Sequence, residues 1–328
     1  MIPVNQHAWE PGRWQDELRQ AFRSSRALLN FLGTQADNIC NDPDFAVLVP
    51  ESFARRMVAG DAQDPLLRQV LATQAEKATD PTFGTDPLAE QHLANDSALI
   101  QKYAHRALLI TTAGCAINCR YCFRRHFPYT EHRDRDFQAS LEQIAADTSL
   151  HEIILSGGDP LILSDAALLK LLQRLDAVPH VKRLRLHTRL PVVLPNRVTQ
   201  GLVAGLHELN KPTTIVLHIN HPQELNQETA KVFANLQDSG AQLLNQSVLL
   251  KGINDSLPVQ TALAEALFEQ GVLPYYLHLA DRVQGTQHFF VDTPQAKALH
   301  QQMQATLPGY LVPRLAQEVP AQPNKVLL

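Results

Sequence analysis

The chain has 328 residues, of which 45% are hydrophobic and 19% charged, and its formal net charge is −4. This composition is typical of a globular protein with a buried core, and it excludes collagen, a coiled coil and a peptide hormone. The charge gives no sequence-wide basic field, so nucleic acid is not expected as the main ligand. No run approaches the roughly 20 apolar residues of a membrane span, and the first 20 residues lack a secretory signal pattern. We therefore expect a cytoplasmic protein without membrane contact.

Residues 1–100 are expected to form a mainly helical N-terminal region. Helical periodicity covers Trp14 to Phe31 and Pro65 to Lys77, and polar, proline-containing stretches separate these runs. Two roles are open for this region: to cover the mouth of a barrel or to mediate assembly.

From Arg106 onward, short apolar runs alternate with longer amphipathic segments. The runs span residues 107–112, 152–156, 181–188, 213–219, 241–250 and 272–279. Each precedes a helix-like segment, and Ser164 and Thr293 are predicted as caps of two of these helices. This alternation predicts parallel strands joined by right-handed crossovers, either as a partial (β/α)6 barrel or as an open doubly wound sheet.

Unusual residues follow the predicted strands and favour the barrel. They are the cysteine-rich loop 115–122, the SGGD turn 156–159, and the segments 187–189, 218–222 and 278–281. In a barrel the carboxyl ends of all strands share one face, so these segments would meet at one cavity. We therefore predict an α/β barrel over residues 101–310, followed by a C-terminal segment, 311–328.

Three of the four cysteines, Cys115, Cys119 and Cys122, fall within eight residues, whereas Cys40 stands alone. A disulfide framework would spread its cysteines, so this clustering indicates reduced thiolates around a metal. The CxxxCxxC spacing suits a cubane iron–sulfur cluster whose fourth iron has no protein ligand and stays open to a small molecule. The alternative is a structural zinc site, completed by Cys40 or a histidine.

The SGGD turn alone would be an ordinary turn. Placed one β/α unit after the cysteine loop, and with Tyr121 before the last cysteine, it resembles the radical S-adenosylmethionine (SAM) family. The chain from Lys102 to Lys325 resembles the lysine 2,3-aminomutases in particular, through matching motifs at 122–125, 188–197, 218–222, 245–255, 274–276 and 309–313. Its short tail resembles the branch that makes (R)-β-lysine for the modification of elongation factor P.

The resemblance implies a partial (β/α)6 TIM-like barrel and an isomerase that converts L-lysine to (R)-β-lysine. It implies three cofactors: a [4Fe–4S] cluster, SAM and pyridoxal 5′-phosphate (PLP). In the family the cluster cleaves SAM to a 5′-deoxyadenosyl radical, which removes a hydrogen from C3 of lysine held on PLP. An electron donor such as flavodoxin is also implied. The link to elongation factor P and its ligase would be functional, without a stable complex.

The resemblance also assigns residues to each cofactor. The cluster would be held by Cys115, Cys119 and Cys122. For SAM, Tyr121 would neighbour the adenine. The SGGD turn, which consists of Ser156, Gly157, Gly158 and Asp159, would bind the methionyl amino group. His218 and Gln246 would lie near the bound cofactors. Asn220 and His221 are expected only to shape the turn before Pro222.

For PLP, the resemblance places Lys325 at the lysine that binds the cofactor covalently, and Lys102, Tyr103 and Arg106 at the cofactor phosphate. For the substrate, Arg124 would pair with the carboxylate. Asp281 and Glu318 would hold the side-chain ammonium.

Two alternatives remain open from the sequence. One is a radical aminomutase acting on another amino acid, such as arginine or ornithine. The other is a zinc-stabilised RNA-binding protein that acts on the translation machinery.

Overall fold

A nine-stranded sheet organises the computed structural model, which describes residues 14–40, 45–90, 98–129 and 134–328. Its strands follow one another in chain order, and all neighbours from β2 to β8 are parallel. β1 and β9 are antiparallel additions at the two edges. The strands are β1 (Leu99–Tyr103), β2 (Arg106–Thr112), β3 (Glu152–Gly157), β4 (Arg183–Thr188), β5 (Thr213–Leu217), β6 (Gln242–Leu249), β7 (Leu273–Leu279), β8 (Arg314–Gln317) and β9 (Val326–Leu327).

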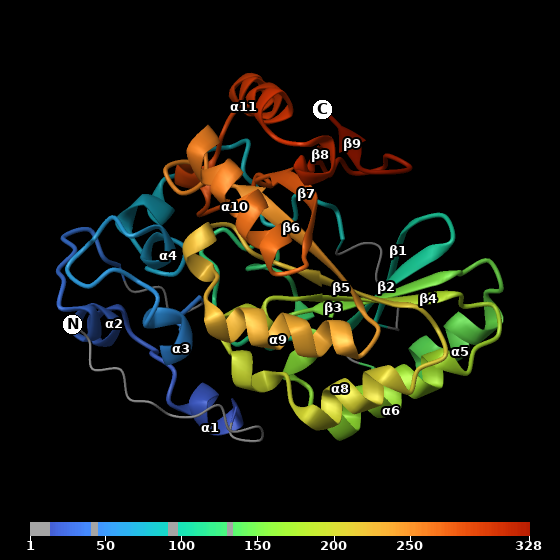
Figure 1. The fold of residues 1–328 in the computed structure, drawn as a ribbon. Coiled ribbons are helices and arrows are strands. Elements are labelled where there is room, and N and C mark those ends of the chain that lie inside the picture. Colours follow the sequence, from blue (N-terminus) through green and yellow to red (C-terminus); the bar gives the residue numbers. More distant parts are fainter. Residues whose placement is uncertain (1–13, 41–44, 91–97, 130–133) are drawn as a thin grey trace.

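A helix follows each strand from β2 to β7, which confirms the predicted six β/α units (Figure 1). These helices are α5 (Gln138–Ala146), α6 (Asp165–Asp176), α8 (Gln200–His207), α9 (Gln227–Asp238), α10 (Leu257–Glu269) and α11 (Thr293–Thr306). A short helix, α7 (Leu190–Val193), precedes α8. The sheet order starts at β1 and ends at β9, and within the described residues these two edges do not pair. The barrel is therefore partial, as predicted.

Strand alternation separates the helix-covered face of the sheet from the face that lines the cavity. On β7, Leu277 and Leu279 belong to a hydrophobic cluster with residues of α10 and α11. Tyr276 and His278, one position away, line the cavity. Because successive side chains of a strand point to opposite faces, the apolar half of β7 anchors the strand and the polar half is left for chemistry.

Helix caps fix where the crossover helices begin. The Ser164 side chain accepts a hydrogen bond from the amide of Ala167, so the predicted cap of α6 is confirmed. The predicted cap at Thr293 is wrong: Asp292 caps α11 by accepting from the amide of Gln295, and Thr293 is the first helical residue. The carboxylate suits this position because it also faces the positive end of the helix dipole.

The N-terminal helices are shorter than predicted. They are α1 (Trp14–Arg19), α2 (Ser25–Leu32), α3 (Glu51–Ala54) and α4 (Pro65–Arg68), followed by the 3₁₀ turn η1 (Gln74–Lys77). The run from Trp14 breaks because Phe22 pairs its backbone with Val49 and Ser24 then caps α2. The run from Pro65 breaks because Thr73 pairs with Ile39. In both places a tertiary backbone pairing replaces intrahelical hydrogen bonds.

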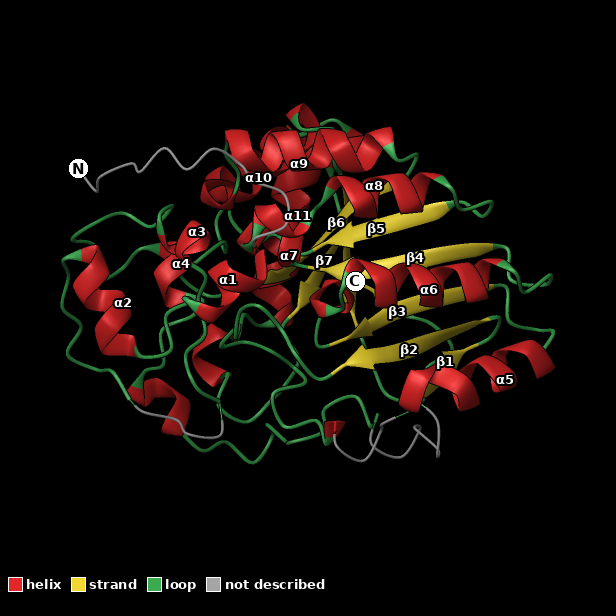
Figure 2. Cartoon of the chain, turned by 90° about the horizontal axis from the view of Figure 1, so that it is seen from below, coloured by secondary structure: helices red, strands yellow, loops and turns green. Residues whose placement is uncertain are grey.

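The N-terminal region lies at the carboxyl ends of the strands (Figure 2). The arrowheads of β2, β3 and β5 point toward the side occupied by α2, α3 and α4. The Ser52 hydroxyl donates to the carbonyl of Val193 at 2.8 Å, which ties α3 to α7. A domain boundary at residue 100 stays a prediction. Across the described ranges, the helices are too short or too polar to cross a bilayer.

A hairpin holds the C-terminal segment in place. Ala316 pairs with Leu327, and Gln317 pairs with Val326. The amide of Leu328 donates to the carbonyl of Leu315 at 3.1 Å. Lys325 therefore stands directly before a paired strand at the sheet edge, rather than on a frayed end.

Candidate active site

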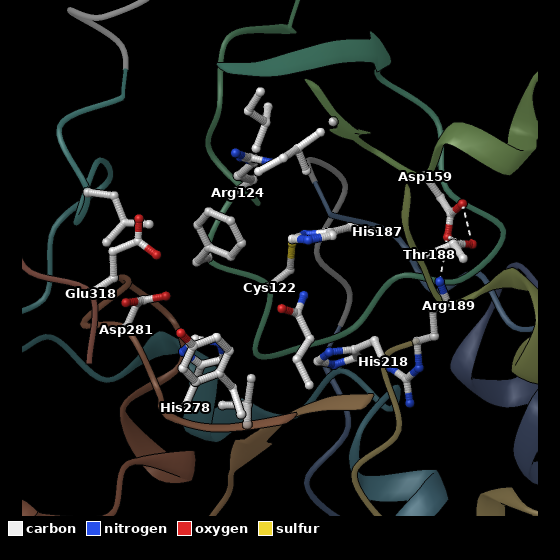
Figure 3. A pocket seen from close by; sticks show the side chains of 18 of the residues that line it. Cys122, Arg124, Asp159, His187, Thr188, Arg189, His218, His278, Asp281 and Glu318 are labelled. Carbon is white, nitrogen blue, oxygen red and sulfur yellow. Dashed lines mark hydrogen bonds between the residues drawn. The ribbon is translucent and has the colours of Figure 1, made fainter. Parts of the chain in front are cut away.

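The predicted site residues gather around one cavity of about 480 Å³ (Figure 3). Those in its wall are Lys102, Tyr103, Arg106, Cys115, Cys119, Tyr121, Cys122, Arg124, Gly157, Gly158, Asp159, His218, Gln246, Asp281, Glu318 and Lys325. Ser156 lies just behind the wall, where its hydroxyl accepts a hydrogen bond from Arg124 Nη1 at 3.3 Å. The predicted convergence of strand ends on one cavity is therefore confirmed, while the role of each residue remains a prediction.

The cysteine loop connects β2 to the rest of the barrel and is held from the N-terminal side. The amide of Asn118 donates to the carbonyl of Leu48 at 3.0 Å, and the amide of Arg120 donates to the carbonyl of Gln69 at 2.8 Å. The fully buried Arg120 side chain forms a bidentate ion pair with Glu76. These contacts give the loop a fixed backbone before any metal binds.

The thiols are electrostatically suited to a bound cation. Burial, and then the neighbouring Asp159 and thiols, raise the pKa of Cys115 well above its usual value. Burial and Cys119 raise the pKa of Cys122 to about 11. Thiolates at these positions therefore need positive charge beside them, which iron supplies. Within the described ranges, no three His, Cys, Asp or Glu side chains converge closely enough to hold a single metal ion. Three thiolates that each hold a different iron of a cluster do not need such convergence.

The SGGD turn packs its backbone against the cysteine loop. Gly157 has φ of +123°, and a Cβ on Gly158 would lie 2.1 Å from the carbonyl oxygen of Gly114. Only glycine allows the two backbones to approach this closely. The amide of Asp159 donates a hydrogen bond to the same Gly114 oxygen at 2.8 Å and so holds them together. The turn therefore brings β3 against the loop that carries the cysteines.

The Asp159 carboxylate points into the fold and not only toward the cavity. It accepts hydrogen bonds from the Thr188 hydroxyl at 2.7 Å and from the amides of Leu161 and Arg189 at 3.0 and 2.7 Å. Burial raises its pKa, and these bonds partly oppose that rise. Its contacts in the structure position the end of β4, and the predicted contact with SAM stays a prediction.

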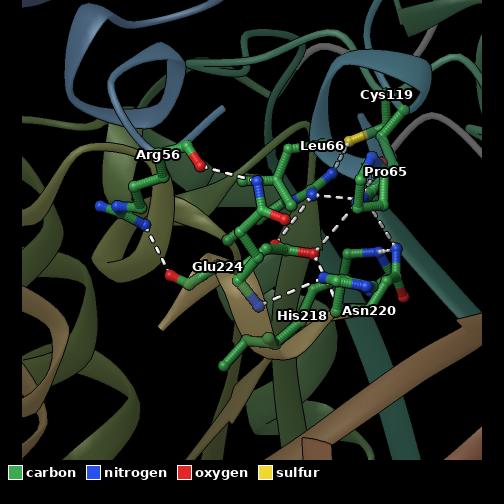
Figure 4. Close-up of polar contacts among 12 residues, drawn as sticks. Arg56, Pro65, Leu66, Cys119, His218, Asn220 and Glu224 are labelled. Carbon is green, nitrogen blue, oxygen red and sulfur yellow. Dashed lines mark hydrogen bonds and ion pairs between the residues drawn. The ribbon is translucent and has the colours of Figure 1, made fainter. Parts of the chain in front are cut away.

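A buried polar cluster lies behind Cys119 (Figure 4). Arg189 Nη1 is 2.7 Å from the Cys119 sulfur and 2.6 Å from the Tyr121 hydroxyl. That hydroxyl is 2.9 Å from His218 Nε2 and accepts from the Asn220 amide at 2.6 Å. The Tyr121 hydroxyl is thus fixed by three polar neighbours, and Asn220 does more than shape a turn. His221, as predicted, shapes it, since its Nδ1 accepts from the amide of Gln223.

A row of alternating charges crosses the other half of the cavity. The Arg124 guanidinium makes two hydrogen bonds, of 2.7 and 3.0 Å, with the Glu90 carboxylate. Lys102 Nζ lies 3.0 Å from Glu90 and 3.1 Å from Glu318, and Lys325 Nζ donates to the other oxygen of Glu318. The five side chains are mostly buried, so each charge is balanced by its neighbours in the row rather than by bulk solvent.

Burial lowers the pKa of Arg124, but the charge and hydrogen bonds of Glu90 together raise it by more, so the net shift is upward. Burial raises the pKa of Glu318, but Lys325 and Lys102 together lower it by more, so the net shift is downward. Both groups therefore stay charged.

Asp281 behaves differently from Glu318, although Figure 3 shows their carboxyl groups next to each other. Burial and the nearby charge of Glu318 raise the pKa of Asp281 to about 7. Burial and Lys325 lower the pKa of His278 to about 3, so this ring is neutral. The pair of acids thus carries one negative charge firmly and a second one only when a cation or a higher pH favours it.

The remaining predicted residues line the wall near Lys325. The Arg106 guanidinium lies over the ring of Tyr103, 4.6 Å from its centre, and the Tyr103 hydroxyl donates to Glu318 at 3.0 Å. His187 Nε2 is shielded from solvent and has no hydrogen-bond partner among the residues that the structure describes. An orphaned polar atom in a cavity wall indicates that the cavity takes a polar ligand.

Cys40, the alternative zinc ligand, is not among the residues lining this cavity, and its sulfur donates to the carbonyl of Thr73 at 3.2 Å. Sequence reasoning missed Glu90, Gln69 and Glu224. Glu90 and Gln69 lie in the N-terminal region, where no motif marks them. Arg189 ends a strand-end segment that the sequence did single out, and its position there was the available signal.

The comparisons with known proteins agree with this geometry. A family model described as the Radical SAM superfamily matches residues 109–262, which contain the cysteine loop and the SGGD turn. That domain takes a [4Fe–4S] cluster and SAM, which favours the predicted cluster over the zinc alternative.

Three curated relatives carry the same name, L-lysine 2,3-aminomutase. The protein from Escherichia coli is 48% identical over 87% of this chain and 83% of its own length. That from Haemophilus influenzae is 42% identical over 100% of this chain and 98% of its own length. That from Buchnera aphidicola is 40% identical over 96% and 95%, respectively. With its cysteine loop, its glycine turn and the lysine of its C-terminal hairpin on one cavity, the chain belongs to the L-lysine 2,3-aminomutase family of the radical SAM superfamily.

Proposed function

We propose that the chain moves the amino group of L-lysine from C2 to C3, using the cluster, SAM and PLP, and that the product is (R)-β-lysine. One observation carries the proposal: the cysteine loop and Lys325 line the same cavity, together with a cation for a carboxylate and two acids for an ammonium. The names of the relatives support the substrate.

The wall around Lys325 fits PLP. A primary amine stands at the cavity surface beside Glu318, and the Tyr276 ring lies 5.8 Å from it. Lys102 and Arg106 provide positive charge for a phosphate, and His187 offers an unused polar atom. Lys325 would hold the cofactor, and Lys102, Tyr103 and Arg106 would hold its phosphate.

When bound, SAM on the cluster supplies a radical that removes hydrogen, and PLP supplies a ring that delocalises the unpaired electron. The chain's own residues position the substrate. Arg124 presents a planar guanidinium fork to the lysine carboxylate, which has to replace Glu90 there. Asp281 and Glu318 receive the side-chain ammonium, and the buried cavity keeps water from the reacting carbon.

The acid pair selects the class of substrate. A cationic side chain favours the charged form of Asp281 beside Glu318, whereas glutamate would bring a third carboxylate to the same place. Ornithine and arginine also carry a cation but differ in length, and such a difference is worth roughly 1–3 kcal/mol. We therefore expect lysine to be preferred over both.

Anaerobic incubation of the reconstituted chain with L-lysine, SAM and dithionite, followed by chiral product analysis, tests the proposal. The expected product is (R)-β-lysine, formed faster than products from ornithine or arginine supplied in competition. Turnover without iron or PLP would overturn the proposal, and so would a faster reaction of either competitor.

Reduction with borohydride tests the role of Lys325 separately. In the PLP-loaded chain we expect borohydride to attach the pyridoxal group permanently to Lys325. This covalent label should be absent from Lys325→Arg. Lys297→Arg, an exposed lysine on α11, is the matched control and should be labelled like the wild type. Equal labelling of both variants would place the cofactor elsewhere.

The physiological setting belongs to the same proposal. We propose a cytoplasmic enzyme that receives electrons from a donor such as flavodoxin. Its product would serve the modification of elongation factor P through a separate ligase. No stable complex with either protein is expected, and co-purification in a fixed ratio would contradict this.

A further inference from the structure

Arg189 is a buried cation that contacts a cluster ligand. Only 5% of the residue is exposed, and its Nη1 lies 2.7 Å from the sulfur of Cys119. Neither the family resemblance nor the conversion of lysine assigns a role to this residue. If Cys119 holds an iron of the cluster, the Arg189 guanidinium would contact the sulfur of a cluster ligand.

Two further residues fix the guanidinium in this orientation. Nη2 donates to Gln69 Oε1 at 2.8 Å and to Glu224 Oε2 at 3.0 Å. Gln69 Nε2 in turn donates to Glu224 Oε1 at 3.2 Å, and both residues are fully buried. Glu224 is therefore bonded to one amino group of Arg189, which leaves the other amino group directed at the Cys119 sulfur and the Tyr121 hydroxyl.

Gln69 brings the N-terminal region into this arrangement. It directly follows α4, and its backbone carbonyl accepts from the amide of Arg120 inside the cysteine loop at 2.8 Å. Its side-chain oxygen accepts from Arg189 and from the Tyr121 hydroxyl, at 2.8 and 3.2 Å. One residue thus holds both the loop backbone and the cation behind the loop.

We propose that Arg189 sets the reduction potential of the cluster through Cys119, and that Gln69 of the N-terminal region positions it. Reduction adds one electron from an external one-electron donor to the cluster and moves no proton, so it adds one negative charge. An N–H donor on the ligand sulfur and a buried positive charge both stabilise that added charge. Arg189 therefore raises the potential and makes the cluster easier to reduce.

The proposal needs only the cluster and not the identity of the amino-acid substrate. The test measures the midpoint potential of the cluster in the anaerobically reconstituted full-length chain. The chain is titrated with dithionite, and the electron paramagnetic resonance signal reports how much of the cluster is reduced. For Arg189→Gln we expect the equilibrium constant for reduction to fall about tenfold, a shift of about 59 mV to lower potential. Arg189→Lys keeps the charge, but one ammonium cannot replace the fork, so we expect a smaller shift in the same direction.

Arg56→Gln is the matched control. Arg56 also bonds Glu224, through the backbone carbonyl at 2.7 Å, and its contacts in the described chain include no cysteine. Arg56→Gln should change the equilibrium constant for reduction of the cluster by less than about twofold, well below the tenfold change expected for Arg189→Gln. An unchanged potential in Arg189→Gln at full iron content would overturn the proposal, as would an equal shift in Arg56→Gln. If Arg189→Gln does not retain iron, Arg189→Lys decides, and an unchanged potential there is the refuting result.

Discussion

Replacing Glu90 by Gln isolates the charge that balances Arg124 and Lys102 in the ligand-free site. Glu90 is 4% exposed and accepts two hydrogen bonds from Arg124, besides its ion pair with Lys102. The amide keeps the size of the side chain but removes its charge and turns an N–H group toward the cations. Breaking a buried ion pair from one side costs about 3–5 kcal/mol, because the partner charge stays buried without compensation. We expect the free energy of unfolding to fall by that amount.

Urea denaturation with and without added acetate measures both halves of this prediction. A small carboxylate should occupy the vacated place on Arg124 and recover part of the lost stability in Glu90→Gln, with little effect on the wild type. For the same reason the variant should bind L-lysine more tightly, since the substrate no longer displaces an internal carboxylate. Glu51→Gln, in an ion pair with Arg55 that is about one-third exposed, should change stability by less than about 1 kcal/mol. A loss below about 1 kcal/mol in Glu90→Gln, or no recovery with acetate, would refute the reasoning.

Three further outcomes follow from other parts of the site. Because the pKa of Asp281 is about 7, lysine affinity should rise about tenfold from pH 6 to pH 8 as the carboxyl group ionises, and Asp281→Asn should abolish this rise in a binding titration. Gly158→Ala places a methyl group against the Gly114 backbone and should cost roughly 1–3 kcal/mol in urea denaturation and lower iron content, while Gly309→Ala, with open space around it, should cost almost nothing. Asp159→Asn removes a charged acceptor of several hydrogen bonds and should cost roughly 2–3 kcal/mol; a melting curve like that of the wild type would show those bonds to be weak.

The barrel could be predicted because its signals are local. Each strand from β2 to β7 is a short apolar run followed by a helical pattern, and the alternation of the two predicts parallel strands joined by crossovers. The cysteine loop and the glycine turn are likewise continuous in sequence. Their meeting follows from the rule that parallel strands end on one face.

The contacts that complete the site are not local. Glu90 reaches Arg124 across 34 positions, and Gln69 reaches Arg189 across 120 positions. No periodicity or spacing connects such pairs, because each depends on how the N-terminal region folds over the strand ends. The short strand at Val326 was also missed, since two residues carry too little pattern to predict a strand.

The row from Arg124 through Glu90, Lys102 and Glu318 to Lys325 limits how the site can be redesigned for another amino acid. Each inner member touches two opposite charges, so a reversal at one position creates repulsion on both sides. Changing Glu318 to a cation, for example, would set it against both Lys102 and Lys325. Reversing Lys325 together with Glu318 does not remove the problem, because the new cation at position 318 still faces Lys102, so charge reversals inside this row should yield few folded enzymes whether they are made singly or in pairs.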